Sequence, residues 1–465
     1  CTQVFGLQEW SLRLVPFLGA IGALLLFPVV VARVLRGWPY VLAVGIFSVS
    51  YWPLRYSAEV KPYGPDMLIS CLWMLLVLRW VESERPWRLV VCMAFLALVG
   101  FGISFPSVFI GGGAVVAMAL AGSRHTWLNR GIQPAIVGVS LLAGFLGTYR
   151  WLVPSRSDTA DFMVSYWQKA FPPTDSASDL ALYFLDILTG ELLPYPVGGE
   201  NFASTGTLLL VVLGVVVLAR AKKWGVLMLL FMPLGLALVA GFLQRYPFGQ
   251  PTRLQLYLAP VFCVFAGQGL ATSMAWFGVA FKIPAWRSPL RVSCVILASI
   301  SVVTMARDVL LPKKSSTDAA LRDAAQAIWG SARFDGPRPL SLREDLGAAF
   351  IDEPRGMHSD TTRFLANYHI RTRSASEPRI QTGAPVQVVT FYVEGVRNYA
   401  RRQTWIEQFE DAHQLRFAGS AILTIPHVDN RENLLRQDEI EILRFEPAAT
   451  ADSMSDPPED EPSIR

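Results

Sequence analysis

The segment from Arg55 to Asp66 brings acidic side chains, basic side chains and two tyrosines together within twelve positions. Apolar runs flank it, at about 40–53 before it and 67–81 after it. Charges are expensive inside hydrocarbon, so acids and bases crowded at a membrane boundary indicate a site for a charged, hydroxyl-rich ligand. The alternative is an ordinary interfacial turn, in which Arg55 and Lys61 extend their charges towards water and Asp66 favours a helix N-terminus.

A second polar segment, Gln244–Arg253, separates two later apolar runs. Pro247, Gly249 and Pro251 rule out a regular helix there and predict a structured turn. Arg245 and Arg253 in such a turn form a candidate clamp for phosphate, because a guanidinium group binds phosphate oxygens with two hydrogen bonds. The alternative is that both arginines anchor helix ends to lipid head groups.

Composition places these segments in a membrane protein. The 465 residues are 52% hydrophobic and only 17% charged, with a mean hydropathy of +0.37, whereas soluble proteins carry about 25% charge. The net charge of +4 indicates no nucleic-acid surface. The five cysteines show no paired or metal-like spacing, so neither a disulfide framework nor a zinc site is predicted.

About ten apolar segments approach the length that spans a bilayer, and they predict a helical bundle. They centre on 15–32, 39–54, 64–81, 88–104, 105–122, 132–152, 205–220, 224–243, 254–276 and 290–310. Alternate short loops carry thirteen basic residues on one side and four on the other. The positive-inside rule therefore places the first set in the cytoplasm, and the loops at 55–66, 153–204 and 244–253 outside.

The long outer loop, 153–204, contains an amphipathic pattern. At helical spacing Leu180, Tyr183, Phe184 and Ile187 share one side, which predicts a helix lying in the outer membrane interface. The alternative is a helix packed against the protein's own outer domain.

The transmembrane bundle is predicted over 1–311, followed by a small α/β extracytoplasmic domain over 312–447 and a disordered tail over 448–465. Segments 319–333 and 401–414 have helical patterns, and strands are expected at 385–393, 415–426 and 439–445. The scattered histidines show no metal-ligand spacing. No nucleophile motif, P-loop or dinucleotide fingerprint occurs.

Four pieces of the chain carry a resemblance, which covers roughly residues 7–275. The run Glu59-Val-Lys-Pro-Tyr-Gly-Pro-Asp66 is similar to the E-x-K-x-Y-x-x-D signature of bacterial GT-C glycosyltransferases, relatives of protein O-mannosyltransferases and aminoarabinose transferases. The runs Trp10–Pro16, Ile103–Phe109 and Tyr246–Arg253 resemble three further family segments in the same order.

This resemblance implies transfer of a sugar from a polyprenyl-phosphate carrier to a glycan, lipid or protein acceptor at the outer face of a bacterial inner membrane. Lys61, Arg245 and Arg253 would meet the phosphate, and Glu59 would position the acceptor or a divalent cation, if one is used. Tyr63 and Asp66 would orient the site. The implied catalytic residues are Glu59, Lys61 and Asp66, and the implied substrate-binding residues are Arg55, Tyr56, Tyr63, Arg245, Tyr246, Gln250 and Arg253.

The chain departs from the family at its start. The family's catalytic base lies in the first outer loop, after a first span, whereas this chain begins at Cys1 and Glu9 is its only carboxylate before the first apolar run. The expectation is a fragment whose main base lies upstream, with about eleven spans once restored. The alternative is a naturally shortened, inactive relative.

Two other function classes remain open. A lipid-linked sugar transporter would show internal repeats or polar residues at mid-span, and no convincing repeat is found. A non-catalytic membrane assembly or binding protein would not need Glu59, Lys61 and Arg253 to converge on one pocket.

Overall fold

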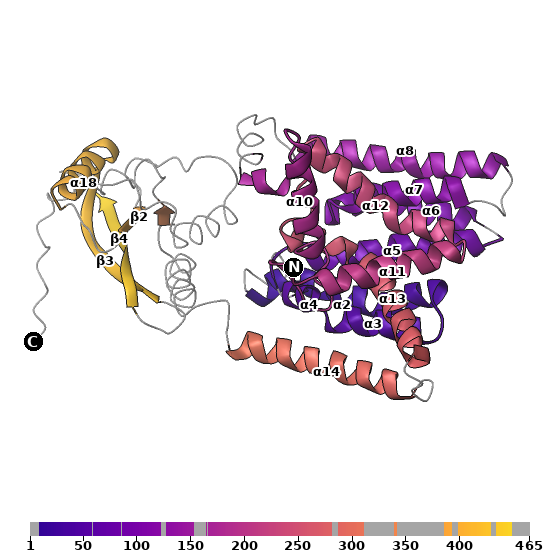
Figure 1. Cartoon of the computed structure of the whole chain (residues 1–465). Helices are drawn as coiled ribbons and strands as arrows, with labels where there is room; N and C mark the ends of the chain where they lie inside the picture. Colours follow the sequence, from indigo (N-terminus) through magenta and orange to yellow (C-terminus); the bar gives the residue numbers. More distant parts are fainter. Residues whose placement is uncertain are drawn as a thin grey trace, which may run out of the picture. The chain divides into compact units, whose positions relative to one another are not determined.

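The computed structural model describes residues 9–57, 59–84, 86–121, 127–152, 164, 166–280, 287–310, 339–341, 386–392, 399–428 and 434–448. The chain divides into two compact units, residues 1–307 and residues 308–465. The first unit is a bundle of helices and the second carries a sheet (Figure 1).

Helices of the first unit coincide with the ten predicted apolar segments. They are α2 (Glu9–Val34), α3 (Trp38–Val49), α5 (Tyr63–Glu82), α6 (Trp87–Ile103), α7 (Ser107–Ala121), α8 (Trp127–Leu152), α11 (Thr205–Arg220), α12 (Trp224–Phe242), α13 (Ala259–Ala280) and α14 (Arg287–Leu310). Among the described residues, five helical segments are long and apolar enough to cross a membrane, and five more are shorter and apolar. The predicted class, a helical polytopic membrane protein, is confirmed, while the number of spans stays a prediction.

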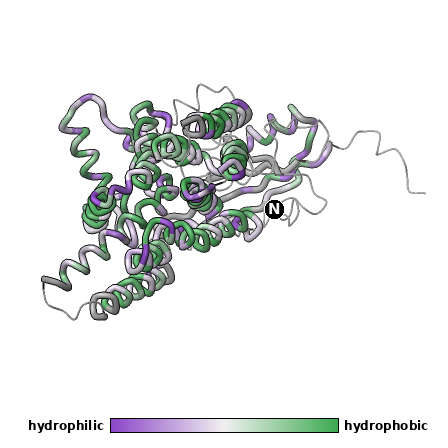
Figure 2. The backbone as a smooth tube through the Cα atoms, turned by 90° about the vertical axis from the view of Figure 1, so that its right-hand side faces the viewer, coloured by the Kyte–Doolittle hydropathy of each residue, from purple (hydrophilic) through white to green (hydrophobic). Residues whose placement is uncertain are grey.

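Two segments lie at the centre of this bundle. Of the residues in their apolar windows, 72% are buried in α5 and 78% in the segment Thr252–Phe277, against 28–33% in α2, α8 and α12. Apolar residues run along the bundle helices, as Figure 2 shows in green. The central segments therefore pack against protein, while much of the apolar surface of the outer helices faces outwards.

Close helix contacts and sharp breaks position the polar segments. A Cβ on Gly64 would lie 2.1 Å from the Pro16 carbonyl oxygen, so the start of α5 crosses α2 with backbone almost touching backbone. Between α6 and α7 the helix stops at Ser104 and restarts at Ser107, as expected from Pro106. After α12 a turn leads into the short 3₁₀ helix η2 (Thr252–Leu258) and then α13.

The long loop between α8 and α11 contains the short 3₁₀ turn η1 (Gln168–Ala170) and the helix α10 (Ala177–Thr189). The predicted helix is therefore present. The side predicted to lie in the membrane interface, with Tyr183, Phe184 and Ile187, instead packs on the core of the bundle, and Ile187 is fully buried. Protein covers this face because Tyr183 donates to the Phe248 carbonyl oxygen and Ile187 packs against Gly249 of the 244–253 turn. The position of α10 in the membrane interface stays a prediction.

The second unit contains a four-stranded sheet in the order β1-β2-β4-β3. Its elements are β1 (Pro339–Ser341), β2 (Val386–Tyr392), α18 (Tyr399–His413), β3 (Leu415–Val428) and β4 (Leu434–Pro447). Strand β1 runs parallel to β2, and the other pairs are antiparallel. Trp405 and Ile406 of α18 pack with Leu443 and Phe445 of β4.

The predicted helix at 401–414 and the three predicted strands are confirmed, while β1 was not anticipated from the sequence. The predicted helix at 319–333 lies outside the described residues, as does the predicted tail from residue 449 onwards.

Candidate functional site

The two polar segments singled out in the sequence meet at one end of the bundle. The short helix α4 (Tyr51–Ser57) leads towards the first segment, and it contacts η2, which carries Arg253. Figure 1 places α4 and α10 at the same end of the helices. Arg253 lies within electrostatic range of Tyr56 and of Tyr63, and so does Glu59. Glu59, Arg253 and the two tyrosines therefore share one neighbourhood.

Aromatic rings build one wall of this neighbourhood. Trp52 stacks on Tyr56 with ring centroids 5.6 Å apart, and Tyr56 meets Tyr63 edge-on at 5.1 Å. Arg55 donates a hydrogen bond from Nη1 to the Tyr51 hydroxyl at 2.8 Å, and its guanidinium lies 5.9 Å from the Tyr56 ring centroid. The rings fix Arg55 beside the site, because an arginine over an aromatic face is held by cation–π attraction.

Opposing charges act on the Tyr56 hydroxyl. Burial raises the pKa of Tyr56 above its ordinary value, and Glu59 raises it further, whereas Arg253 and Arg55 lower it. Glu191 adds a smaller upward shift to the same pKa. The net shift is upward, so Tyr56 stays protonated at neutral pH and acts as a hydrogen-bond donor there.

The Arg253 turn is held by the long loop. The Thr252 N–H donates to Glu191 Oε2 at 2.8 Å, and the Thr252 hydroxyl donates to the Glu191 carbonyl oxygen at 2.8 Å. Tyr183 of α10 donates from its hydroxyl to the Phe248 carbonyl oxygen at 2.5 Å. With Thr252 fixed in this way, the Arg253 guanidinium lies 5.9 Å from the centroid of the Trp167 ring.

Two residues expected to bind substrate are engaged in building the turn. Gln250 donates from Nε2 to Asp186 Oδ2 of α10 at 2.8 Å. Tyr246 is 9% exposed, and its hydroxyl donates to the Leu254 carbonyl oxygen at 2.7 Å. Both side chains therefore order the turn that carries Arg253, and their contact with a substrate stays a prediction.

Other expected site residues project outwards. Lys61 and Arg245 are exposed, and Glu59 is half-buried. The Lys61 backbone N–H donates to the Glu59 carbonyl oxygen at 2.8 Å, which folds the two residues into one tight bend. The exposed charges of Lys61 and Arg245 are accessible to a ligand. Among the described contacts, none joins Lys61 or Arg245 to Tyr56 or Tyr63.

Asp66 lies deeper, where three of the four resembling segments converge. Asp66 is 6% exposed, and its carboxyl is close to Ser104, at the break between α6 and α7. Tyr246 of the turn and Tyr257 of η2 also lie within electrostatic range of Asp66. Asp66 therefore belongs to the packing beneath the site and not to its open surface.

Sequence reasoning did not include Glu191, Trp167, Tyr51 and Arg307 in the predicted site. Arg307, near the end of α14, places its guanidinium 5.8 Å from the centroid of the Tyr51 ring, and the Arg55 guanidinium also lies near that ring. No spacing in the sequence distinguishes Glu191 from the other acids of its loop. Its role depends on a partner 61 positions further along the chain.

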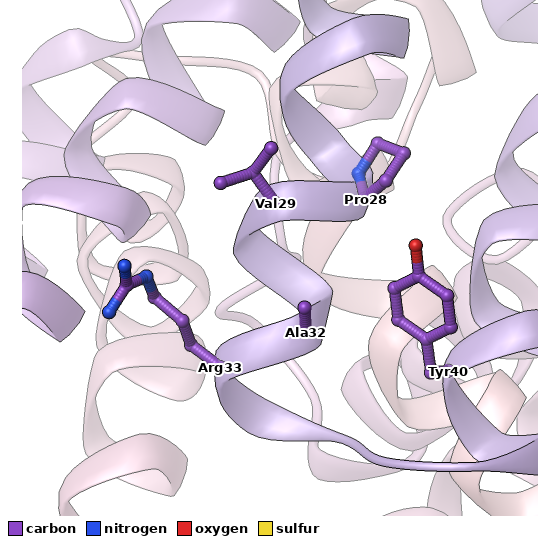
Figure 3. A pocket seen from close by; sticks show the side chains of 5 residues that line it. All are labelled: Pro28, Val29, Ala32, Arg33 and Tyr40. Atoms are coloured by element: carbon purple, nitrogen blue, oxygen red, sulfur yellow. The ribbon is translucent and has the colours of Figure 1, made fainter.

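Metal-ligand clusters and surface pockets were the other candidate sites in the part of the chain that the structure describes. No group of three His, Cys, Asp or Glu side chains is arranged to hold a metal in that part of the chain. A shallow surface pocket lies by the C-terminal end of α2, lined by Pro28, Val29, Ala32, Arg33 and Tyr40 (Figure 3). Arg33 there is paired with Glu82, which is not among the residues that line the pocket, so the lining holds one base and no acid.

Comparisons with known proteins bear on the first third of the chain. Residues 1–151 match the family model of dolichyl-phosphate-mannose-protein mannosyltransferases. This match confirms the resemblance to GT-C glycosyltransferases over that segment, which includes Arg55–Asp66. No curated protein matches the chain.

One solved structure is similar at low identity: ArnT from Cupriavidus metallidurans bound to undecaprenyl phosphate. The match covers 95% of this chain and 85% of that one, with 12% identity and a TM-score of 0.45. Similarity at this level carries no assignment of ligand or activity to this chain.

Proposed function

We propose that this protein is a membrane glycosyltransferase that moves a sugar from a polyprenyl-phosphate donor to an acceptor on the extracytoplasmic side. One observation carries the proposal. Glu59, Tyr56 and Tyr63, which lie inside the segment matched by the mannosyltransferase family model, share their neighbourhood with Arg253, which lies far outside it. Two distant segments therefore supply an acid, hydroxyl groups and a guanidinium to one place.

The chemistry of sugar transfer accounts for these residue types. The leaving group is a lipid phosphate, and its developing charge needs fixed cations. Arg253 would take phosphate oxygens with its guanidinium, and Lys61 and Arg245 would meet the same group as mobile surface cations. Arg55, held against Tyr51 and Tyr56, would add positive potential.

The acceptor side of the reaction needs a hydroxyl to be oriented and deprotonated. Glu59 would position that hydroxyl, and Tyr56 and Tyr63 would donate hydrogen bonds to the substrates. Gln250 and Tyr246 would act through the turn that they order. If the reaction uses a divalent cation, Glu59 is the residue that would position it.

The proposed setting follows from charge and hydropathy. The donor is a lipid, so the site would lie at a membrane surface. The basic residues in the loops favour the outer face of a bacterial inner membrane, and the C-terminal unit would then be extracytoplasmic. The acceptor is a glycan, a lipid or a protein. These placements rest on the distribution of basic residues in the loops.

A binding experiment tests the phosphate assignment before any sugar is known. The purified chain in lipid nanodiscs is titrated with undecaprenyl phosphate, and binding is followed by native mass spectrometry. We expect Arg253→Ala and Lys61→Ala to weaken binding about tenfold or more, as loss of one charge-assisted contact predicts. Arg220→Ala, which removes an arginine from the last turn of α11, is the matched control.

Three outcomes are informative. Loss of binding in the first two variants alone supports the phosphate site. Equal binding in all variants would overturn it. Wild-type binding without transfer, when sugar-charged carrier from source membranes is supplied with those membranes as acceptor, would favour the non-catalytic binding role.

A further inference from the structure

A buried polar cluster lies beneath the proposed site, and the proposed sugar chemistry leaves it unexplained. It contains Asp66 and Ser70 of α5, Ser104 at the α6–α7 break, and Tyr257 of η2. All four are buried, with exposed fractions of 6% or less. Among the described residues, Asp66 Oδ1 and the hydroxyl oxygens of Ser70, Ser104 and Tyr257 have no partner at normal hydrogen-bond geometry.

The members of the cluster lie close together. Ser104 is near enough to the Asp66 carboxyl to interact with it directly, and Tyr257 is within electrostatic range. Ser70 follows Asp66 by one helical turn, which places both side chains on the same face of α5. Three separate chain segments, α5, the α6–α7 break and η2, therefore place buried hydroxyl groups in the neighbourhood of one carboxyl group.

The charge balance at Asp66 is incomplete. An isolated carboxylate in an apolar interior is strongly unfavourable unless a positive charge compensates it. No lysine or arginine of the described residues is among the groups acting on Asp66, and burial itself is the largest influence. The titratable neighbours of Asp66 on the packed elements are Tyr63, Tyr246 and Tyr257. A tyrosine side chain carries no charge near pH 7, so none of them compensates the carboxylate.

We propose that Asp66, Ser70, Ser104 and Tyr257 form a binding site for one monovalent cation, either Na⁺ or a proton, that neutralises Asp66. Carboxylate and hydroxyl oxygens are ligands that hard cations prefer. A single carboxylate matches a single positive charge, and a divalent ion would leave an excess charge in the interior. Bound there, the cation joins the start of α5, the α6–α7 break and η2, the segment that carries Arg253.

This proposal does not depend on sugar transfer, so it is tested by stability. Thermal unfolding of the full chain in nanodiscs is measured while Na⁺ replaces choline at constant ionic strength, from about pH 6 to about pH 9, a range that avoids most other carboxylates. A cation bound only by the folded state raises the melting temperature as its concentration rises.

The two cations give different results. If Na⁺ binds, the wild type gains stability with Na⁺ and Asp66→Asn does not. If a proton binds, Na⁺ has no effect, and the wild type loses stability relative to Asp66→Asn as the pH rises. One proton changes the unfolding equilibrium constant at most tenfold per pH unit. A constant difference between the two proteins across all Na⁺ concentrations and pH values would overturn the proposal.

A second pair of variants covers a failure of Asp66→Asn to fold. Tyr257→Phe removes one oxygen of the site. Tyr195→Phe is the control: its hydroxyl is equally buried and also has no hydrogen-bond partner among the described residues, but it lies near Cys263 and not near Asp66. We expect Tyr257→Phe alone to shift the Na⁺ midpoint or the pH midpoint of the stability curve. Identical midpoints in both phenylalanine variants and the wild type would contradict the site.

Discussion

Glu191 fixes the turn that carries Arg253, and its removal should loosen that turn. Glu191→Ala deletes the carboxylate that accepts the Thr252 N–H at 2.8 Å, while the bond from the Thr252 hydroxyl to the Glu191 carbonyl oxygen can remain. Glu191→Gln keeps an oxygen acceptor of the same length. The pair of variants therefore separates the anchoring bond from the rest of the side chain.

The magnitude follows from that single bond. A hydrogen bond to a charged group contributes about 1.5–3 kcal/mol, and the half-buried setting of Glu191 reduces this towards about 1 kcal/mol. About 1 kcal/mol corresponds to roughly a fivefold change in an equilibrium constant. Hydrogen exchange of the Thr252 amide should therefore quicken about fivefold in Glu191→Ala, by the same conversion, and change little in Glu191→Gln.

The matching functional assay is undecaprenyl phosphate binding. We expect the dissociation constant to rise about fivefold in Glu191→Ala and less than twofold in Glu191→Gln, because Arg253 loses its fixed position only in the first. Glu200→Ala, at an exposed acid of the same loop, is the control. Unchanged Thr252 exchange in Glu191→Ala would refute the anchoring role. Faster Thr252 exchange with unchanged undecaprenyl phosphate binding would show that the order of this turn does not affect phosphate binding.

Three further predictions concern the same turn and the C-terminal unit. Gly249 has φ +81°, and a Cβ there would lie 2.8 Å from the Ile187 side chain, so Gly249→Ala should lower stability by about 1–3 kcal/mol in thermal unfolding. Burial raises the pKa of Glu191, so the folded chain holds this proton more tightly and loses stability as the pH rises from about 4.5 upwards; Glu191→Gln should flatten that part of a stability–pH curve. Arg402 donates to the buried Glu441 at 2.6 and 3.0 Å, and Arg402→Ala should destabilise the second unit by about 3 kcal/mol in denaturant titration, since it removes two hydrogen bonds and a compensating charge from a buried carboxylate.

The sequence predicted the helices of the bundle well because each reflects a local property. A run of apolar residues long enough to approach a bilayer's thickness can satisfy its backbone only as a helix. The break at Ser104–Ser107 was visible for the same reason, since Pro106 removes a backbone donor and clashes with the preceding turn. The sheet of the second unit was largely predictable from alternating residues, except for the three-residue strand β1.

The orientation of α10 was not predictable in this way. Its amphipathic pattern shows that one face avoids water, but lipid and protein satisfy that face equally well. The 244–253 turn decided the outcome, because it gives that face a specific partner. The Phe248 carbonyl oxygen accepts a hydrogen bond from Tyr183, and Gly249 packs against the buried Ile187.

The sequence by itself determined that this is a helical membrane protein and that residues 55–66 and 244–253 hold the groups suited to a charged ligand. Only the tertiary structure brought Arg253 to Tyr56 and Tyr63, assigned Glu191 to anchor Thr252, and enclosed Asp66 with Ser104 and Tyr257. The physical reason is range. Hydropathy and helix breaking act between near neighbours in the chain, whereas hydrogen bonds and charge compensation at a site join segments that only the packed helices bring together.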